Sequence, residues 1–399
     1  MAAGLSSEST QPQPVATADA LRRVAIGLPA ARGNGERCFP LTPEAVRWLV
    51  DSYRDNTSLS VKIEAGAARD IHYTDARYTR CGACVCDRTA ALRTDIVITA
   101  AGLDPADIST LRRGAMWISL LAPEDIDAEA LKAAAARHIT VISLMRVTDA
   151  TGNCHFADTL AEVDGRAAIT VAAGLLADNT HGKGILLGGI AGIIPCEVVV
   201  IGAGIAGMAA AKSAAGLGAT VRVFDDDPSR LRILAGSCGG AVIPSSLHRE
   251  VFLRAVTKAD IIINTLRESS SSRKSVLSAD DIATLKNEVI VIDTVDSRTF
   301  PSLRHIELSQ ASATDIFSGR FCFVNAACAV PRTASMAISN CLVPLLEKMI
   351  SATSALDPIR IETGLKNGLV TIGGQIVCRE AAAAAGLNYV DPSIYLHLS

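Results

Sequence analysis

The chain has few aromatic residues, almost no net charge and no long apolar run, and each of these properties excludes a class of protein. Aromatic residues make up 4% of the 399 residues, and the formal net charge at pH 7 is −3. A chain so close to neutrality has no general attraction to nucleic acid or to an anionic membrane surface, so we expect neither as a partner. The most apolar short stretch, residues 185–194, is interrupted by Gly188, Gly189 and Gly192 and is too short to span a bilayer.

The N-terminal segment lacks the features of a targeting sequence. Residues 1–21 have no apolar centre, which argues against a secretory signal, and we expect them to form a flexible tail. Glu8, Asp19 and a shortage of arginine argue against a transit peptide. The 11 cysteines are odd in number and scattered along the chain, which favours reduced thiols in a reducing compartment. We therefore expect a cytoplasmic protein.

The closest group of cysteines allows two interpretations. Cys81 and Cys84 stand at the spacing of a zinc knuckle, and Cys86 follows two residues later. No second pair of cysteine or histidine residues lies near enough in the sequence to complete a tetrahedral site. The alternative, which we favour, is a short buried strand that uses cysteine as a small hydrophobic residue. We therefore predict no metal site.

The composition provides enough apolar material for two packed domains. Hydrophobic residues make up 49% of the sequence and charged residues 20%, as in globular proteins. A chain of 399 residues is longer than one core normally accommodates. Apolar runs alternate with stretches of helical periodicity, which is typical of α/β proteins with parallel sheets. Strands are predicted at 22–29, 60–64, 95–99, 140–145, 197–201, 220–224, 241–243, 260–264, 289–292 and 321–325, and helices at 41–50, 127–138, 157–179 and 334–350.

One segment joins an apolar strand, a glycine-rich turn and a helix. After the strand at 197–201, Gly202, Gly204 and Gly207 have the spacing of a dinucleotide-binding turn. Gly202 permits the tight turn, Gly204 lets the backbone approach a pyrophosphate, and Gly207 lets the helix pack closely against the strand. The pyrophosphate then lies at the helix N-terminus, where N–H groups and the helix dipole favour negative charge. The segment therefore predicts a Rossmann domain.

The next predicted strand ends in an acidic residue. Asp225 follows the turn at the separation, about twenty residues, at which a carboxylate binds the ribose hydroxyls. The same carboxylate repels a 2′-phosphate, so the sequence predicts NAD in preference to NADP. Arg222 lies inside the strand and Arg230 beyond it, and neither clearly overturns this preference.

At this point the sequence resembles the alanine dehydrogenase family, with the transhydrogenase alpha subunit as a close cousin. The segments that carry the resemblance run in family order along almost the whole chain from residue 23 onward. They are residues 41–46, 64–67, 162–166, 182–190, 216–221 and 325–333. The glycine-rich segment at 188–192 and the segment at 325–333 favour alanine dehydrogenase over the transhydrogenase.

The resemblance implies an α/β fold of two Rossmann-like, doubly wound parallel-sheet domains, with the NAD domain inserted in the substrate domain. We expect a tail at 1–21, a first substrate-domain segment at 22–152 and the NAD domain at 153–334. The segment at 335–399 is expected to return to the substrate domain, because its short, mixed end cannot form a core alone. The family also implies a homohexamer.

The chemistry that the resemblance implies is the conversion of L-alanine, NAD and water to pyruvate, ammonia and NADH. An amino acid or 2-oxo acid would be the substrate. The family's carboxylate-binding arginine corresponds to Arg37, and its catalytic carboxylate corresponds to Asp296. The cofactor site corresponds to Gly202, Gly204, Ile205, Ala206, Gly207, Asp225, Thr265, Leu266, Val295 and Asn325.

Three positions depart from the family pattern. The family's substrate lysine falls in the segment 98–101, which contains no lysine, so Ala101 stands at this place. The family's catalytic histidine is replaced by Leu121, and a serine that helps to bind the cofactor phosphate is replaced by Ala161. A leucine can neither transfer a proton nor polarise a carbonyl, and the loss of such a group typically costs ~10²–10⁴-fold in rate.

The remaining histidines offer no clear replacement. His72, His155 and His181 are expected to lie at the surface or beside the site rather than to act in catalysis. Two functions therefore stay open. The first is an NAD-dependent amino-acid oxidoreductase with an altered substrate, and the second is an NAD-binding paralogue that has lost catalysis and acts in sensing or assembly.

Overall fold

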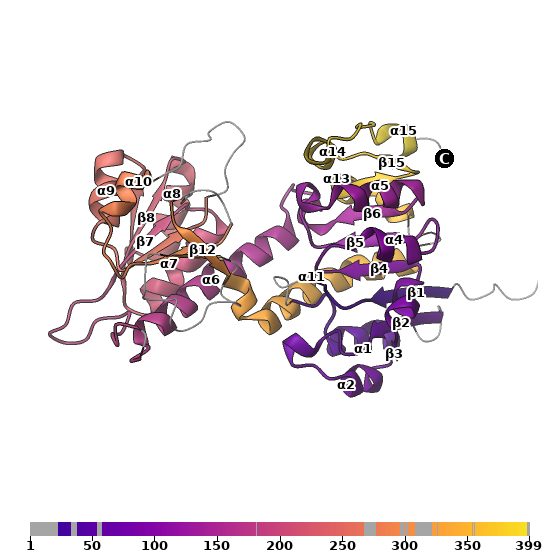
Figure 1. Ribbon diagram of the computed structural model, residues 1–399, viewed down its shortest axis with the longest axis horizontal. Helices are drawn as coiled ribbons and strands as arrows, with labels where there is room; N and C mark the ends of the chain where they lie inside the picture. Colours follow the sequence, from indigo (N-terminus) through magenta and orange to yellow (C-terminus); the bar gives the residue numbers. More distant parts are fainter. Residues whose placement is uncertain are drawn as a thin grey trace, which may run out of the picture.

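The computed structural model consists of two α/β halves joined by two long helices, α6 (His155–Ala177) and α11 (Pro331–Ser351) (Figure 1). The residues that it describes are 23–32, 38–53, 58–180, 182–266, 277–295, 300, 302–307, 321–324, 326–352, 354 and 356–396. The predicted tail at 1–21 lies outside these residues.

The first sheet combines strands from both ends of the chain. Within the described residues its order is β15-β14-β6-β5-β4-β1-β2-β3. The strands β1 to β6 pair in parallel, whereas β14 is antiparallel to β6 and to β15. The sheet is therefore mixed, which differs from the parallel sheet that we predicted, because β14 and β15 form a hairpin at its edge. Its strands are β1 (Arg23–Leu28), β2 (Ser58–Glu64), β3 (Cys84–Cys86), β4 (Ile96–Thr99), β5 (Met116–Ser119), β6 (Thr140–Ser143), β14 (Leu369–Ile372) and β15 (Gln375–Ile376).

The second sheet is parallel throughout its described pairs and has the order β12-β13-β11-β10-β7-β8-β9. The chain adds β8 and β9 on one side of β7. It then crosses back and places β10 and the later strands on the other side of β7. Ligands of doubly wound sheets bind at such a switch point, outside the carboxyl ends of the strands. Its strands are β7 (Glu197–Ile201), β8 (Thr220–Asp225), β9 (Val242–Ser246), β10 (Ile261–Asn264), β11 (Ile290–Asp293), β12 (Arg304–Glu307) and β13 (Phe321–Val324).

Both sheets are buried on two faces, which explains why their central strands are continuous apolar runs. In β4, Val97 belongs to one core cluster and Ile98 to another, because neighbouring side chains of a strand point to opposite faces. In β7, Val198 and Val199 are divided in the same way between the two clusters of the second sheet.

The shorter helices lie against these sheets and connect their strands. In the first half they are α1 (Pro43–Ser52), α2 (Asp75–Arg80), α3 (Arg88–Leu92), α4 (Pro105–Thr110), α5 (Ala128–Ala136), α12 (Asp357–Ile361), α13 (Thr363–Asn367), α14 (Arg379–Ala385) and α15 (Ser393–Leu396). In the second half they are α7 (Ile205–Gly216), α8 (Pro228–Cys238), α9 (Arg249–Val256) and α10 (Ala279–Ala283), and single 3₁₀ turns occur at η1 (Arg69–Ile71), η2 (Pro123–Asp125), η3 (Leu144–Arg146) and η4 (Ala326–Ala329).

The first predicted helix, at 41–50, is confirmed as α1. The helix α1 begins at Pro43, and the hydroxyl oxygen of Thr42 accepts a hydrogen bond from the Ala45 N–H at 3.3 Å. The first N–H groups of a helix have no acceptor within the helix. Proline has no N–H at this position, and the threonine hydroxyl accepts a hydrogen bond from another of these groups.

The cysteine-rich segment forms the predicted strand, β3, but the prediction that the strand is buried is wrong. Cys81 is buried, whereas Cys84 is exposed and Cys86 is half-buried. The reason is that β3 is an edge strand, paired only with β2 within the described residues.

The helix α11 returns the chain to the first half. The hydroxyl oxygen of Ser335 accepts a hydrogen bond from the Phe39 N–H at 2.8 Å, and that of Ser339 accepts one from the Thr42 N–H at 3.1 Å. Further along the helix, Leu342 is buried in the core of the first sheet. Among the helices of the described residues, none has the length and the apolar character needed to cross a bilayer.

Candidate functional site

A cavity of about 620 Å³ lies at the carboxyl ends of β7, β10 and β11, where the second sheet changes direction. Its walls are the glycine turn after β7, the residues that follow β10 and β11, and one face of α6. Of the sequence-predicted cofactor residues, Gly202, Gly204, Ile205, Ala206, Thr265, Leu266 and Val295 line this cavity. Gly207 and Asp225 lie directly behind the turn.

The glycine turn leaves no room for side chains at two of its positions. Gly202 has φ +102°, and a Cβ atom there would be 2.5 Å from the Thr265 hydroxyl oxygen. A Cβ atom on Gly207 would be 1.9 Å from the carbonyl oxygen of Gly202. At Gly204, by contrast, a Cβ atom would meet nothing within 4 Å, because this residue borders the cavity. The turn therefore forms a close-packed base with open space above it.

The helix α7 presents its N-terminus to this open space. Its N-cap is Gly204, which has no side chain to accept a hydrogen bond from the first turn. The N–H groups of that turn and the positive end of the helix dipole are suited to bind an anion such as a pyrophosphate.

Asp225, at the end of β8, is 3% exposed and holds the turn in place. Its Oδ2 accepts a hydrogen bond from the Ala203 N–H at 2.6 Å, and its Oδ1 accepts one from the Asp227 N–H at 2.8 Å. The guanidinium of Arg230 lies 3.9 Å from Oδ2 and also lines the cavity. A carboxylate oxygen can accept two hydrogen bonds, so Asp225 retains capacity for ribose hydroxyls.

Two buried polar residues shape the opposite side of the cavity, and the sequence analysis missed both. The Asn264 amide donates to Asp293 Oδ1 at 2.9 Å. Asn264 Oδ1 accepts a hydrogen bond from the Leu266 N–H at 3.2 Å, and Asp293 Oδ1 accepts one from the Val295 N–H at 3.1 Å. The pair therefore fixes the backbone after both strands. The available signal was a polar residue at the end of each otherwise apolar strand.

The helix α6 closes the cavity and carries two carboxylates into its wall, Asp158 and Asp164. The helix packs tightly on the turn, since a Cβ atom on Gly165 would be 2.1 Å from the Ala206 carbonyl oxygen. Asp164 Oδ1 accepts a hydrogen bond from the Ala327 N–H at 3.1 Å. Burial raises the pKa of Asp158, with a smaller contribution in the same direction from Asp149 and an opposing one from His155. Ala161, on the same wall, offers no hydroxyl.

Three of the candidate residues, Arg37, Asp296 and Asn325, lie outside the described residues. Among the described candidates, the structure brings most of the predicted cofactor residues together around one cavity.

Of the three positions that depart from the family pattern, two lie in the first half, Ala101 and Leu121, and both are apolar. Ala101 is buried after β4, and a Cβ atom on the adjacent Gly102 would be 3.4 Å from Leu121 Cδ1. The backbone of Leu121 is held from two sides: its N–H donates to Ser119 Oγ at 3.1 Å, and its carbonyl accepts from Ser143 Oγ at 2.7 Å. This corner of the first sheet is firmly structured, and neither the Ala101 nor the Leu121 side chain can transfer a proton.

Neither His72 nor His155 lines the dinucleotide cavity. His72, with φ 58°, borders a separate hollow of about 460 Å³ beside Tyr73 and Asp75. The His155 Nε2 atom is 3.1 Å from Asp149 Oδ2, and its side chain is largely exposed. His181 lies outside the described residues. Within the described residues, no group of three or more His, Cys, Asp and Glu side chains could hold a metal ion.

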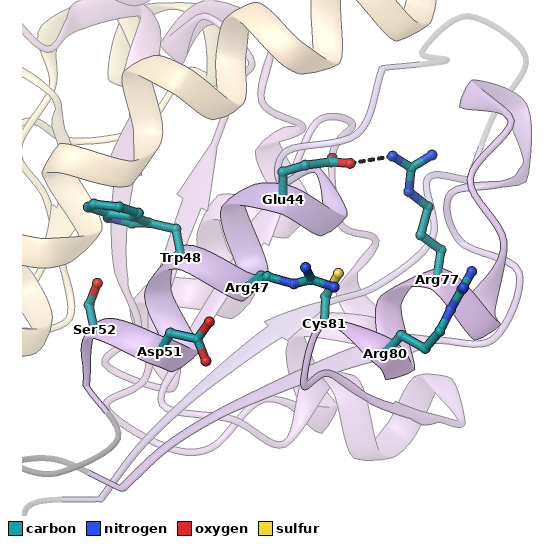
Figure 2. Close-up of a pocket in the computed structure, with 8 residues that line it drawn as sticks. All are labelled: Glu44, Arg47, Trp48, Asp51, Ser52, Arg77, Arg80 and Cys81. Carbon is teal, nitrogen blue, oxygen red and sulfur yellow. Dashed lines mark hydrogen bonds and ion pairs between the residues drawn. The ribbon is translucent and has the colours of Figure 1, made fainter.

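A larger hollow, of about 820 Å³, lies on the outer face of the first half between α1 and α2 (Figure 2). Glu44 and Arg77 form an ion pair across it, and the Trp48 indole N–H donates to Glu347 of α11 at 2.8 Å. Of the sequence-predicted site residues that the structure describes, none lines this hollow. We therefore assign the candidate site to the smaller cavity at the switch point.

Comparisons with known proteins identify relatives along nearly the whole chain. Residues 27–163 match the family described as alanine dehydrogenase/PNT, N-terminal domain, and residues 168–379 match alanine dehydrogenase/PNT, C-terminal domain. The chain is 29% identical over 390 residues to the alanine dehydrogenase of Mycolicibacterium smegmatis, covering 93% of this chain and 99% of the relative. It is 27% identical over 378 residues to that of Mycobacterium tuberculosis, covering 93% and 99%.

Solved structures show the same fold. An L-alanine dehydrogenase superposes with a TM-score of 0.80 at 24% identity, covering 90% of this chain and 98% of that one. The transhydrogenase from Sinorhizobium meliloti superposes with a TM-score of 0.71 at 21% identity, covering 89% and 99%. The two family matches together span both halves of the molecule, and the chain therefore belongs to the alanine dehydrogenase/PNT family.

Proposed function

We propose that this protein is an NAD-dependent oxidoreductase of an amino acid or 2-oxo acid, related to alanine dehydrogenase but with an altered substrate. The observation that carries the proposal is the cavity at the switch point, with the glycine turn at its base. Relatives of this fold use NAD, and the cavity has the features that a dinucleotide requires.

The residues present fit the cofactor. The N-terminus of α7 would bind the pyrophosphate, and Asp225 would accept hydrogen bonds from the ribose of the adenosine half. The backbone at Thr265 and Leu266 would flank the adenosine side, Asn325 would lie beside the nicotinamide, and Val295 would also contact the cofactor. When bound, NAD accepts a hydride from the α-carbon of the substrate.

We further propose that the substrate domain consists of residues 22–152 and 335–399 and that the NAD domain spans 153–334. The pairing of β14 with β6, and the packing of α11 on the first core, support this division. Arg37 would bind the substrate carboxylate, and Asp296 would lie near the amino group, as the resemblance implies. A cooperatively folding fragment that ends at Gly152 would contradict the division.

We also propose a homohexamer located in the cytoplasm, because the relatives are alanine dehydrogenases and because the Cys81, Cys84 and Cys86 thiols form no disulfide. Light scattering of the purified protein checks the hexamer.

A second function has its own supporting observation. Leu121 and Ala101 stand where the family has its histidine and lysine, and neither side chain can polarise a carbonyl or transfer a proton. This favours an NAD-binding paralogue that has lost catalysis and acts in sensing or assembly. The two functions share the cofactor site and differ only in turnover.

One experiment separates them. The purified protein is first titrated with NADH to measure binding, and NADH formation is then followed with NAD and a panel of amino acids. We expect binding together with alanine turnover several orders of magnitude below the ~1–10³ s⁻¹ of typical enzymes. Faster turnover of another amino acid supports the oxidoreductase, whereas binding without turnover of any member supports the paralogue. Absence of binding contradicts both.

Restoring the missing groups sharpens this experiment. We expect the double variant Leu121→His with Ala101→Lys to raise alanine turnover by ~10²-fold or more, because it returns a proton donor and a cation to the site. The matched control is Leu121→Met with Ala101→Ser, which changes the same positions without adding either group. Rapid alanine oxidation by the unmodified protein would show that another residue has taken over their role.

A further inference from the structure

The first turn of α6 places Asp158 in the wall of the dinucleotide cavity, together with Leu266, Thr294 and Val295. The helix packs on the glycine turn at Gly165 and against β11 and η4, which belong to the half of the sheet opposite Asp225. From Gly165 to Asp158 the helix rises about 10 Å. This rise leads toward the first half of the molecule, because the N-terminal end of α6 lies beside η3.

This position is the nicotinamide end of the cavity. In a doubly wound sheet the two halves of a dinucleotide lie on the two sides of the switch point. Asp225 and Arg230 mark the side of β8, where the adenosine ribose would bind. The side of β11 is therefore left for the nicotinamide, and Asp158, which lines the cavity together with Thr294 and Val295 after β11, borders that side.

The Asp158 carboxylate has no hydrogen bond or ion pair within the described residues. Its neighbour on the same wall, Asp164, is by contrast engaged by the Ala327 N–H. The charged groups that act on Asp158 are His155 and Asp149, which lie 3.1 Å from each other at the start of the helix. The positive charge of Arg230 is at the other end of the cavity, beside Asp225.

We propose that Asp158 is a specificity-determining residue that makes this site prefer the oxidised dinucleotide over the reduced one. The nicotinamide ring of NAD⁺ carries a positive charge, whereas the ring of NADH is neutral. A half-buried carboxylate at this end attracts the charged ring of NAD⁺ but has no such Coulomb attraction to the neutral ring of NADH. The inference rests on the proposed NAD binding and adds to it a preference between the two redox forms.

The preference has a consequence for the bound cofactor. A tenfold stronger binding of NAD⁺ relative to NADH lowers the reduction potential of the bound two-electron couple by about 30 mV. The site would therefore shift the equilibrium between bound substrates toward the amino acid.

The test compares dissociation constants rather than activity. Binding of NAD⁺ and NADH is measured by calorimetry for the full-length protein and for Asp158→Asn, Asp158→Glu and Asp280→Asn. Asp280 is an exposed carboxylate of the same half that does not line the cavity, so its variant is a charge-matched control. We expect Asp158→Asn to reduce the ratio Kd(NADH)/Kd(NAD⁺) by about tenfold. Asp158→Glu and Asp280→Asn should leave the ratio within about twofold of the wild-type value.

Each result decides one point. An unchanged ratio in Asp158→Asn, or an equal change in Asp280→Asn, overturns the assignment while NAD binding stands. A wild-type protein that binds neither dinucleotide overturns the proposed function and this inference together.

The pH dependence of the ratio provides a second readout. Because burial raises the pKa of Asp158, the preference should be present above that pKa and lost as the pH falls through it. In Asp158→Asn the ratio should not follow this titration. His155, Asp149 and Asp164 also face this region, so the measurement is repeated in His155→Gln, which removes the imidazole that lies 3.1 Å from Asp149. A pH profile that is lost in His155→Gln but kept in Asp158→Asn would contradict the proposal.

Discussion

At the carboxyl edge of the second sheet, a glycine turn and a helix N-terminus leave backbone N–H groups facing a cavity. The corresponding edge of the first sheet is closed by a charge cluster around Arg88. Its Nε donates to Asp107 Oδ1 at 2.8 Å, and its Nη1 donates to Glu64 Oε2 and to the Ala30 carbonyl, both at 2.9 Å. One edge thus satisfies its polar groups within the protein, whereas the other keeps donors for a ligand. The same layered architecture therefore has one edge braced by ion pairs around Arg88 and one edge whose free N–H groups face a dinucleotide cavity.

The largest expected effect concerns the closed edge. The Arg88 side chain is 13% exposed, and its removal takes the cation from the half-buried Glu64 and leaves the buried Asp107 with the more distant Arg32, at 3.5 Å. We expect Arg88→Met to reduce the free energy of unfolding of the first half by about 3–5 kcal/mol. NADH binding by protein that remains folded should be unchanged.

Hydrogen exchange resolved by segment, with NADH titration, checks both parts. The control is Arg112→Met, because Arg112 and Asp95 form an exposed pair that should contribute less than about 1 kcal/mol. Equal losses in the two variants would contradict the distinction between a buried cluster and a surface pair.

The open edge is tested by a pair of glycine substitutions. Gly207→Ala places a Cβ atom 1.9 Å from the Gly202 carbonyl oxygen, so we expect it to destabilise the second half by about 1–3 kcal/mol. Gly204→Ala meets no atom within 4 Å and should leave stability unchanged while weakening NADH binding.

Thermal unfolding and NADH titration separate the two outcomes. If Gly204→Ala binds NADH as tightly as the wild type, the cavity is not the dinucleotide site. If Gly207→Ala is as stable as the wild type, the glycine turn can shift to make room for the extra Cβ atom. The turn would then not be the close-packed base that the comparison of the two edges assumes.

A third prediction concerns the choice of cofactor at the open edge. We expect Asp225→Ala to weaken NADH binding by about tenfold, because it removes the acceptor for the ribose hydroxyls. The wild type should bind NADH more tightly than NADPH. Arg230, whose guanidinium is 3.9 Å from Asp225 Oδ2, is the group that would favour a 2′-phosphate.

Fluorescence titration with both dinucleotides measures this preference. Arg230→Gln serves as the comparison variant and should increase the discrimination against NADPH. Identical curves for NADH and NADPH in the wild type would remove the basis for assigning NAD.

The smallest expected effect is acid sensitivity at the opposite edge of the second sheet. Burial opposes ionisation of Asp260, but hydrogen bonds from the Lys286 ammonium at 2.7 Å and the Glu197 N–H at 3.0 Å outweigh it and lower the pKa from the ordinary 3.8. A lowered pKa in the folded state means that the carboxylate stabilises the protein above pH 3.8. This contribution is lost as the pH falls through the folded-state pKa.

We therefore expect Asp260→Asn to cost about 1 kcal/mol near neutral pH and progressively less below pH 3.8. Urea unfolding of both proteins across this pH range is the measurement. A difference that stays constant down to low pH would show that the aspartate acts through its shape rather than through its charge.

The parts of the fold that could be predicted are those that depend on residues close together in the sequence. The central strands of both sheets are continuous apolar runs because both faces are buried, and this is why the strands at 197–201 and 260–264 were predicted. The antiparallel pairing of β14 with β6 was not predicted, because it depends on where α11 delivers the end of the chain. The exposure of Cys84 was missed for a similar reason, since a sequence does not reveal which strand lies at an edge.

In the candidate site, too, the local features could be predicted from the sequence, whereas those that depend on long-range packing could not. By itself the sequence determined the glycine turn and Asp225, because the geometry of a tight turn and the strand that follows it are local. Only the tertiary structure decided that Asn264 and Asp293 brace the cavity and that Asp158 borders it. Asp158 is more than a hundred residues from Val295 in sequence, and the two line one cavity only because α6 packs across the carboxyl edge of the second sheet. Local residues specify a binding turn, whereas long-range packing of a helix on a sheet specifies the charge that the bound ligand meets.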